Sequence, residues 1–119
     1  MSHTQEILTH HLTAFGNNNL DEIMKDYTEQ SEILTIDGSL KGLAAIRKFF
    51  VEMFATIPTG SEFEMKQLTI TQNIAHIVWA SKSNVAEIPL GSDTFVFEND
   101  KIKFHSVVAY ISNTKCQQQ

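Results

Sequence analysis

Two titratable residues lie where the sequence is otherwise apolar. His11 falls within the apolar stripe of a predicted helix. Asp93 alternates with Phe95 and Phe97, so it shares the aromatic face of a predicted strand. Burial shifts the pKa of such groups, and groups that transfer protons in enzymes are commonly of this kind. The pattern makes both residues candidates for acid/base chemistry. The alternatives are that His11 is a core-edge histidine and that Asp93 bonds the backbone of the preceding loop.

His105 is a third candidate, and its direction depends on the register of the last predicted hairpin. A two-residue turn between its strands would place Asp93 opposite Ser106. A three-residue loop would place Asp93 opposite His105. A one-residue slip exchanges the two faces of a strand, so the residues alone leave both registers open.

A metal site is a weaker interpretation of the same residues. His11, His105 and Asp93 would supply two imidazoles and one carboxylate, but no local ligand spacing supports such a site. The motifs of nucleotide-binding loops, serine hydrolases and zinc proteases are also missing from the sequence. We therefore expect neither a metal nor a cofactor.

The other histidines and two further polar residues have structural interpretations. His3 and His10 are expected at the surface, and His76 at the surface or in a dimer contact. Asp37 is expected in a turn, and Tyr27 in the core with its hydroxyl at a polar rim.

The composition excludes several classes of protein. The chain has 119 residues, of which 14 are acidic and 9 are Lys or Arg, and it shows no basic stripe for a nucleic acid. Its single cysteine cannot form an internal disulfide. No segment approaches the ~20 apolar residues of a membrane span, and no signal peptide is visible. We expect a cytoplasmic protein with one domain at residues 1–112 and a polar, disordered tail at 113–119.

Helical periodicity dominates the first half of the chain and strand alternation the second, which predicts an α+β fold. A turn at Asp37-Gly38 is expected to join the first two strands, and tight turns at 72–73 and 99–100 the later ones. The expected helices are 4–15, a short one capped by Asn19, and one from Leu43 to the residue before Pro58. The expected strands are 33–36, 39–41, 63–71, 74–83, 92–98 and 101–112, with a looser connection through Pro89 and Gly91.

Two of these strands are apolar on both faces. In the last strand Phe104, Val108 and Tyr110 alternate with further apolar residues. An antiparallel sheet with one solvated face should alternate with polar residues instead. Three short helices can cover only one face, so we expect a homodimer that covers the other.

Several strings resemble those of a known superfamily. They are FGNNNLDEI from Phe15, the passage Tyr27–Ile36, GLAAIRKFF at Gly42–Phe50 and DTFVFENDKIKFHSVVAYI at Asp93–Ile111. With the order of the elements, they resemble the nuclear transport factor 2-like superfamily, which includes ketosteroid isomerases and SnoaL-like polyketide cyclases. The resemblance implies a cone-shaped curved antiparallel sheet packed by three N-terminal helices around an apolar cavity.

The resemblance also implies roles for single residues. Asp93 and His11 fall where ketosteroid isomerases carry the Asp and Tyr of the oxyanion hole. Thr35 falls at the position of the base and cannot act as one at neutral pH, so the familiar steroid isomerase mechanism is not expected. The resemblance favours the register that turns His105 into the cone beside Asp93 and His11. The other residues expected to line the pocket are Tyr27, Thr35, Phe50, Phe54, Phe95 and Val107.

Two functions follow as hypotheses. The first is a cofactor-independent isomerase, cyclase or dehydratase that acts on an apolar carbonyl compound. In it Asp93 gives or shuttles a proton, His105 is general acid or base, and His11 orients the substrate. The second is a non-catalytic dimeric module that binds an apolar ligand or a partner, which the missing base at Thr35 favours. A cavity filled by phenylalanine rings would also favour the module.

Overall fold

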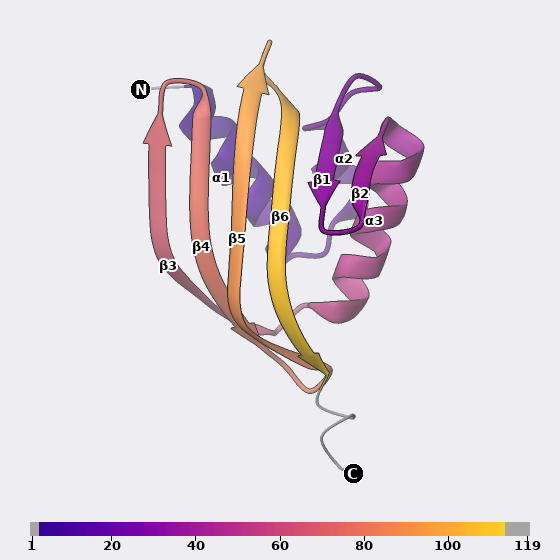
Figure 1. Cartoon of the computed structure of the whole chain (residues 1–119), viewed down its shortest axis with the longest axis vertical. Coiled ribbons are helices and arrows are strands. Elements are labelled where there is room, and N and C mark those ends of the chain that lie inside the picture. Colours follow the sequence, from indigo (N-terminus) through magenta and orange to yellow (C-terminus); the bar gives the residue numbers. More distant parts are fainter. Residues whose placement is uncertain (1–2, 114–119) are drawn as a thin grey trace.

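The computed structural model describes residues 3–113, which form helices packed on one face of a curved sheet (Figure 1). The elements are α1 (His3–Gly16), α2 (Leu20–Met24), β1 (Glu32–Thr35), β2 (Gly38–Lys41), α3 (Leu43–Thr56), β3 (Glu62–Thr71), β4 (Ile74–Lys82), β5 (Ala86–Glu98) and β6 (Lys101–Asn113). Of the expected tail, Asn113 ends β6 and residues 114–119 lie outside the described residues.

The six strands form one open sheet in the order β2-β1-β6-β5-β4-β3. Every neighbouring pair is antiparallel except β1 and β6, which run parallel. Figure 1 shows α1 behind the long strands and α3 beside the short β1–β2 hairpin. The curved, unclosed sheet with its covering helices confirms the α+β class, with one parallel pair in a sheet that was expected to be antiparallel throughout.

The predicted helix boundaries hold to within a few residues. The side chain of Asn19 caps α2 by accepting a hydrogen bond from the Glu22 backbone N–H at 3.2 Å. The helix α3 ends at Thr56, two residues before Pro58. Among the described residues, the helices are too short or too polar to cross a membrane.

The β1–β2 turn differs from its prediction. Its two loop residues are Ile36 and Asp37, and Gly38 already pairs with Thr35 as the first residue of β2. The hydroxyl of Thr35 donates to the Gly38 carbonyl at 3.0 Å and accepts from the Asp37 N–H at 3.1 Å. These two bonds hold the turn one residue earlier than the Asp-Gly signal indicated, and Gly38 supplies a positive φ of 121°.

The strand β5 is longer than expected. It begins at Ala86 and continues through Pro89 and Gly91, which were expected in a loop. The register against β6 shifts between Glu87 and Leu90. This irregularity accommodates Pro89, which cannot donate a backbone hydrogen bond to a neighbouring strand.

A bulge in the last hairpin decides which way its side chains point. Asn99 and Asp100 form the predicted two-residue turn, with φ of 54° and 63°. The register then shifts by one residue, because Phe97 lies opposite Ile102 whereas Val96 lies opposite Phe104. Beyond the bulge Asp93 lies opposite Val107 and on the same face as His105, so neither predicted register was right. His105 nevertheless points to the helix-covered face, beside Asp93, as the family resemblance favoured.

The two faces of the sheet differ sharply in exposure. On the helix-covered face Ile33, Phe95 and His105 are buried. On the opposite face of β6, Val108 is 58% exposed and Tyr110 is 69% exposed. The helices thus cover one apolar face, and the other lies open in the single chain.

Candidate functional site

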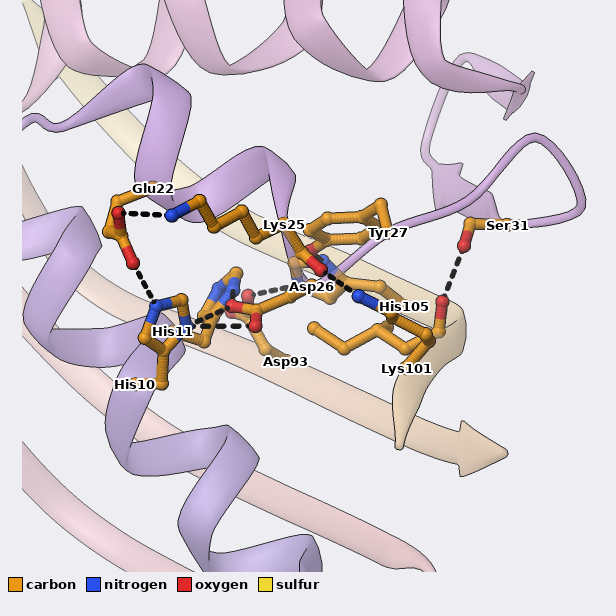
Figure 2. A network of polar contacts seen from close by, with 11 residues as sticks. His10, His11, Glu22, Lys25, Asp26, Tyr27, Ser31, Asp93, Lys101 and His105 are labelled. Atoms are coloured by element: carbon orange, nitrogen blue, oxygen red, sulfur yellow. Dashed lines mark hydrogen bonds and ion pairs between the residues drawn. The ribbon is translucent and has the colours of Figure 1, made fainter. Parts of the chain in front are cut away.

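A buried carboxylate–imidazole pair forms the centre of the candidate site. Asp93 on β5 and His105 on β6 lie within 2.7 Å of each other, from Oδ2 to Nε2 (Figure 2). His105 is only 2% exposed and Asp93 9%. The register bulge places both side chains on the helix-covered face, where the ring of Phe95 stacks on His105 with centroids 4.2 Å apart.

Tyr27 holds the other side of the imidazole ring. Its hydroxyl lies 2.9 Å from His105 Nδ1. Burial, followed by the charges of Asp93 and Asp26, raises the pKa of Tyr27 well above its usual value of 10.0, so the phenol keeps its proton. With Asp93 ionised and His105 neutral, Nε2–H donates to the carboxylate and Nδ1 accepts from the phenol. Both ring nitrogens of His105 are then bonded to the protein.

Trp79 on β4 fixes the second oxygen of Asp93. The indole N–H donates to Asp93 Oδ1 at 2.8 Å. Gly91 makes room for the indole, because a Cβ at Gly91 would lie only 2.4 Å from two of its ring atoms. The side chain of Asp93 thus faces one N–H donor at each oxygen.

His11 approaches the pair from α1. Its ring lies edge-to-face on Phe95 at 5.1 Å and on the His105 ring at 5.7 Å, measured between centroids. Burial lowers the pKa of His11 from the usual 6.5, although the nearby Asp26 carboxylate opposes that shift. At neutral pH His11 is therefore a neutral imidazole with one N–H and one lone pair.

Asp26, in the segment after α2, connects His11 with the surface. Its Oδ2 lies 3.7 Å from His11 Nδ1, a distance beyond a hydrogen bond, and that buried nitrogen has no partner. Its Oδ1 bonds His10 Nδ1 at 2.8 Å, and His10 Nε2 bonds Glu22 Oε1 at 2.8 Å. Figure 2 shows this row of side chains beside the Asp93–His105 pair. The bond with Glu22 raises the pKa of His10 above 6.5.

A cavity of about 240 Å³ adjoins these groups between the helices and the sheet. His11, Asp93 and His105 contribute to its wall together with Trp79 and Ser61. Among the described residues that line the cavity, these five are the only ones with nitrogen or oxygen atoms in their side chains. The apolar lining residues are Leu12, Phe15, Phe49, Phe50, Met53, Ile57, Pro58, Phe63, Ile77, Phe95 and Val107, with Gly16 and Gly60. Contacts link His11, His105, Asp93 and Trp79, which form a small polar end of this otherwise apolar chamber.

The expected pocket residues divide into two groups. Phe50, Phe95 and Val107 line the cavity, whereas Tyr27, Thr35 and Phe54 do not. Each of the three departures has a structural reason, and together they correct the expected lining. Tyr27 is buried behind His105 and bonded to it. Thr35 is bonded into the β1–β2 turn. Phe54 is turned onto Phe15, with ring centroids 5.3 Å apart.

Two residues of the site, Asp26 and Trp79, were not expected there from the sequence. Asp26 is 6% exposed and contacts both His10 and His11, yet it lies in an irregular segment without alternation. In the strand pattern Trp79 counts as an apolar residue, and the pairing of β4 with β5 brings its N–H to Asp93. An aspartate next to a buried tyrosine was the one available signal for Asp26. In the described part of the chain, no group of three or more His, Cys, Asp or Glu side chains has an arrangement that could hold a metal ion.

Comparisons with known proteins identify the fold. No family model and no curated protein matches the sequence. The epoxide hydrolase/cyclase-like enzyme SalBIII, with a role in pyran ring formation in the polyether salinomycin, superposes with a TM-score of 0.76 at 19% identity, covering 92% of this chain and 95% of that one. A SnoaL-like protein of unknown function from Burkholderia thailandensis gives 0.73 at 17% identity, with coverages of 91% and 95%. An NTF2-like protein of unknown function from Cytophaga hutchinsonii gives 0.70 at 14% identity, with coverages of 90% and 89%. The chain therefore has the same α+β fold as these NTF2-like and SnoaL-like proteins.

Proposed function

We propose that the chain binds a small apolar molecule with an oxygen function in the cavity and transfers a proton on it without a cofactor. The reaction classes that fit are isomerisation, cyclisation and dehydration. The observation that carries the proposal is the Asp93–His105 pair at 2.7 Å, buried in the polar end of an otherwise apolar cavity. A desolvated, fixed carboxylate is a suitable general base for a carbon acid.

We assign different roles to the three polar residues. Asp93 is the base, because it contributes the only carboxyl group among the described residues that line the cavity. His105 works through Asp93, since both of its ring nitrogens are bonded within the protein. This proposed role differs from the general acid or base expected of His105 from the sequence. His11 lines the cavity from helix α1, whereas Asp93 and His105 line it from the sheet.

The cavity volume restricts the ligand. An apolar cavity of about 150 Å³ holds a benzene molecule, so the present one fits about ten non-hydrogen atoms. That is a single substituted ring and not a steroid. Lining by phenylalanine rings adds apolar recognition, and the rings of Phe50 and Phe95 leave the chamber open.

Proton transfer can be tested without knowledge of the natural substrate. Menthone is a monocyclic ketone of fitting size, and its C–H groups next to the carbonyl exchange with deuterium when a base abstracts their protons. We expect the protein to accelerate this exchange in D₂O, followed by proton NMR, and the Asp93→Asn variant to lose the acceleration. A wild-type protein that binds menthone but accelerates no exchange would refute catalysis.

That last outcome would favour the second candidate, a non-catalytic binding module. One observation favours this candidate. The hydroxyl of Thr35 is hydrogen-bonded within the β1–β2 turn, so Thr35 supplies no general base from β1. The expected homodimer and the cytoplasmic location both stay predictions.

A further inference from the structure

The polar end of the cavity offers few hydrogen-bond donors to a ligand. The Trp79 N–H is donated to Asp93, and the Ser61 hydroxyl is donated to the Pro58 carbonyl at 2.6 Å. His105 donates to Asp93 through Nε2 when Asp93 is ionised. Among the five polar side chains in the described cavity wall, only His11 could therefore donate a hydrogen bond to a ligand. Whether it does depends on which ring nitrogen carries the proton.

Asp26 settles the proton position on His11. The Nδ1 atom of His11 is buried and faces Asp26 Oδ2 at 3.7 Å without any other partner. A carboxylate only accepts hydrogen bonds, so a lone pair on Nδ1 would face negative charge, whereas an N–H there is attracted to it. Asp26 is held in place by His10 on its other side. The neutral ring therefore carries its proton on Nδ1 and its lone pair on Nε2.

We infer that the polar end of the cavity recognises a hydroxyl group, which donates its single hydrogen to one of two acceptors: the Asp93 carboxylate or His11 Nε2. Asp26 is then a positioning residue that makes His11 an acceptor. The inference rests on the proposed function and narrows its ligand from any apolar oxygen compound to an apolar alcohol, enol or hydroxy ketone. A ligand with a carbonyl as its sole polar group would leave both acceptors unpaired, which disfavours its binding.

Menthol and menthone test this preference, because they share one carbon skeleton and differ in having a hydroxyl or a carbonyl. We expect menthol to bind the wild-type protein at least about tenfold more tightly, since a hydrogen bond to a charged acceptor contributes enough for that ratio. The affinities can be measured by titration followed through the fluorescence of Trp79, the single tryptophan of the chain. If menthone binds as tightly as menthol or more so, the inference fails while the binding function stands. If neither binds, the binding function fails and the inference with it.

The state of His11 is measured separately, without a ligand, by ¹⁵N–¹H correlation NMR of the histidine rings. We expect Nδ1 protonated and Nε2 unprotonated in the wild type, and a loss of this preference in Asp26→Asn. Glu22→Gln is the matched control, because Glu22 contacts His10 and not His11, and it should leave the His11 signals in place. A wild-type His11 with its proton on Nε2 would overturn the assignment, even if Asp26→Asn fails to fold.

Discussion

At the residue scale, the centre of the site is the Asp93 side chain, whose hydrogen bonds to the protein are already formed in the absence of a ligand. Asp93 receives an N–H from Trp79 and another from His105, and His105 in turn is held by Tyr27. Fixed donors cost no reorganisation when charge moves during a reaction, which is the main advantage of a preorganised site. The same bonds also stabilise the fold, so substitutions must separate the two effects.

Replacing Asp93 by Asn separates the effect on catalysis from the effect on stability. The amide keeps an oxygen for Trp79, while its NH₂ group meets His105 Nε2 and forces that ring into its other tautomer. We expect a loss of about 1–2 kcal/mol in the free energy of unfolding, against a loss of 10²- to 10⁴-fold in deuterium exchange if Asp93 is the base. Urea denaturation and the exchange assay measure the two quantities. Asp37→Asn, in the exposed β1–β2 turn, is the control and should change neither. An Asp93→Asn protein that does not fold would make Asp93 a structural group.

His10 and His11 on α1 predict opposite pH dependences of stability. The pKa of His11 is lowered on folding by burial, so the unfolded chain binds a proton there more readily than the folded one. The wild type should therefore lose stability as the pH falls below about 6.5, down to the folded pKa. Asp26, Asp93 and His105 face His11 from the other elements and set that lower limit.

Urea denaturation between pH 7.5 and 5 tests this dependence. We expect His11→Gln to lose less stability than the wild type on acidification. His10 has a raised pKa, so its contribution is present below pH 6.5 and is lost as the pH rises through the folded value. His10→Gln should therefore flatten the alkaline side of the profile instead. Equal acid slopes in the wild type and His11→Gln would contradict the burial effect.

At the element scale, the sequence predicted which helices and strands form, but it did not predict the bulges and register shifts within them. Periodicity predicted all three helices, and Asn19 and Pro58 predicted two of their ends. The bulge in the β5–β6 hairpin carries no sequence signal, because Lys103 is an ordinary strand residue. That bulge nevertheless decides whether His105 or Ser106 faces the cavity. Contacts such as Asp26 to His11 arise from packing between segments and are invisible to any local pattern.

Gly91 shows how one strand position supports the site. Alanine at this position would place its Cβ on the indole ring of Trp79 and displace the N–H that Asp93 accepts. We expect Gly91→Ala to cost about 1–3 kcal/mol of stability, as overpacking does, and to shift the Trp79 emission. Thermal unfolding and fluorescence measure both. Gly16→Ala is the control, since a Cβ at Gly16 meets nothing within 4 Å. An unchanged Trp79 emission in Gly91→Ala would show that the indole has another position for its N–H.

At the scale of the whole molecule, the outer face of the sheet is the feature that a single chain leaves unexplained. Large apolar side chains from three strands lie on that face: Leu34, Ile74, Phe104, Val108 and Tyr110. Each is at least 38% exposed. Patches of this kind on a globular protein usually mark an interface. A second copy of the chain is the simplest cover, because a two-fold axis lets the same patch serve both partners.

Light scattering after size exclusion at micromolar concentration tests this dimer. We expect the wild type at twice the 13.4 kDa of one chain, and Val108→Glu at the monomer mass, because two buried carboxylates would face each other without partners. Val51→Glu is the matched control: Val51 on α3 is 52% exposed, close to the 58% of Val108, but lies away from the outer face. A monomeric wild type would contradict the interface. The cavity lies on the opposite side of the sheet, so a monomeric Val108→Glu protein should still bind menthol, and loss of binding would mean that the dimer holds the site in shape.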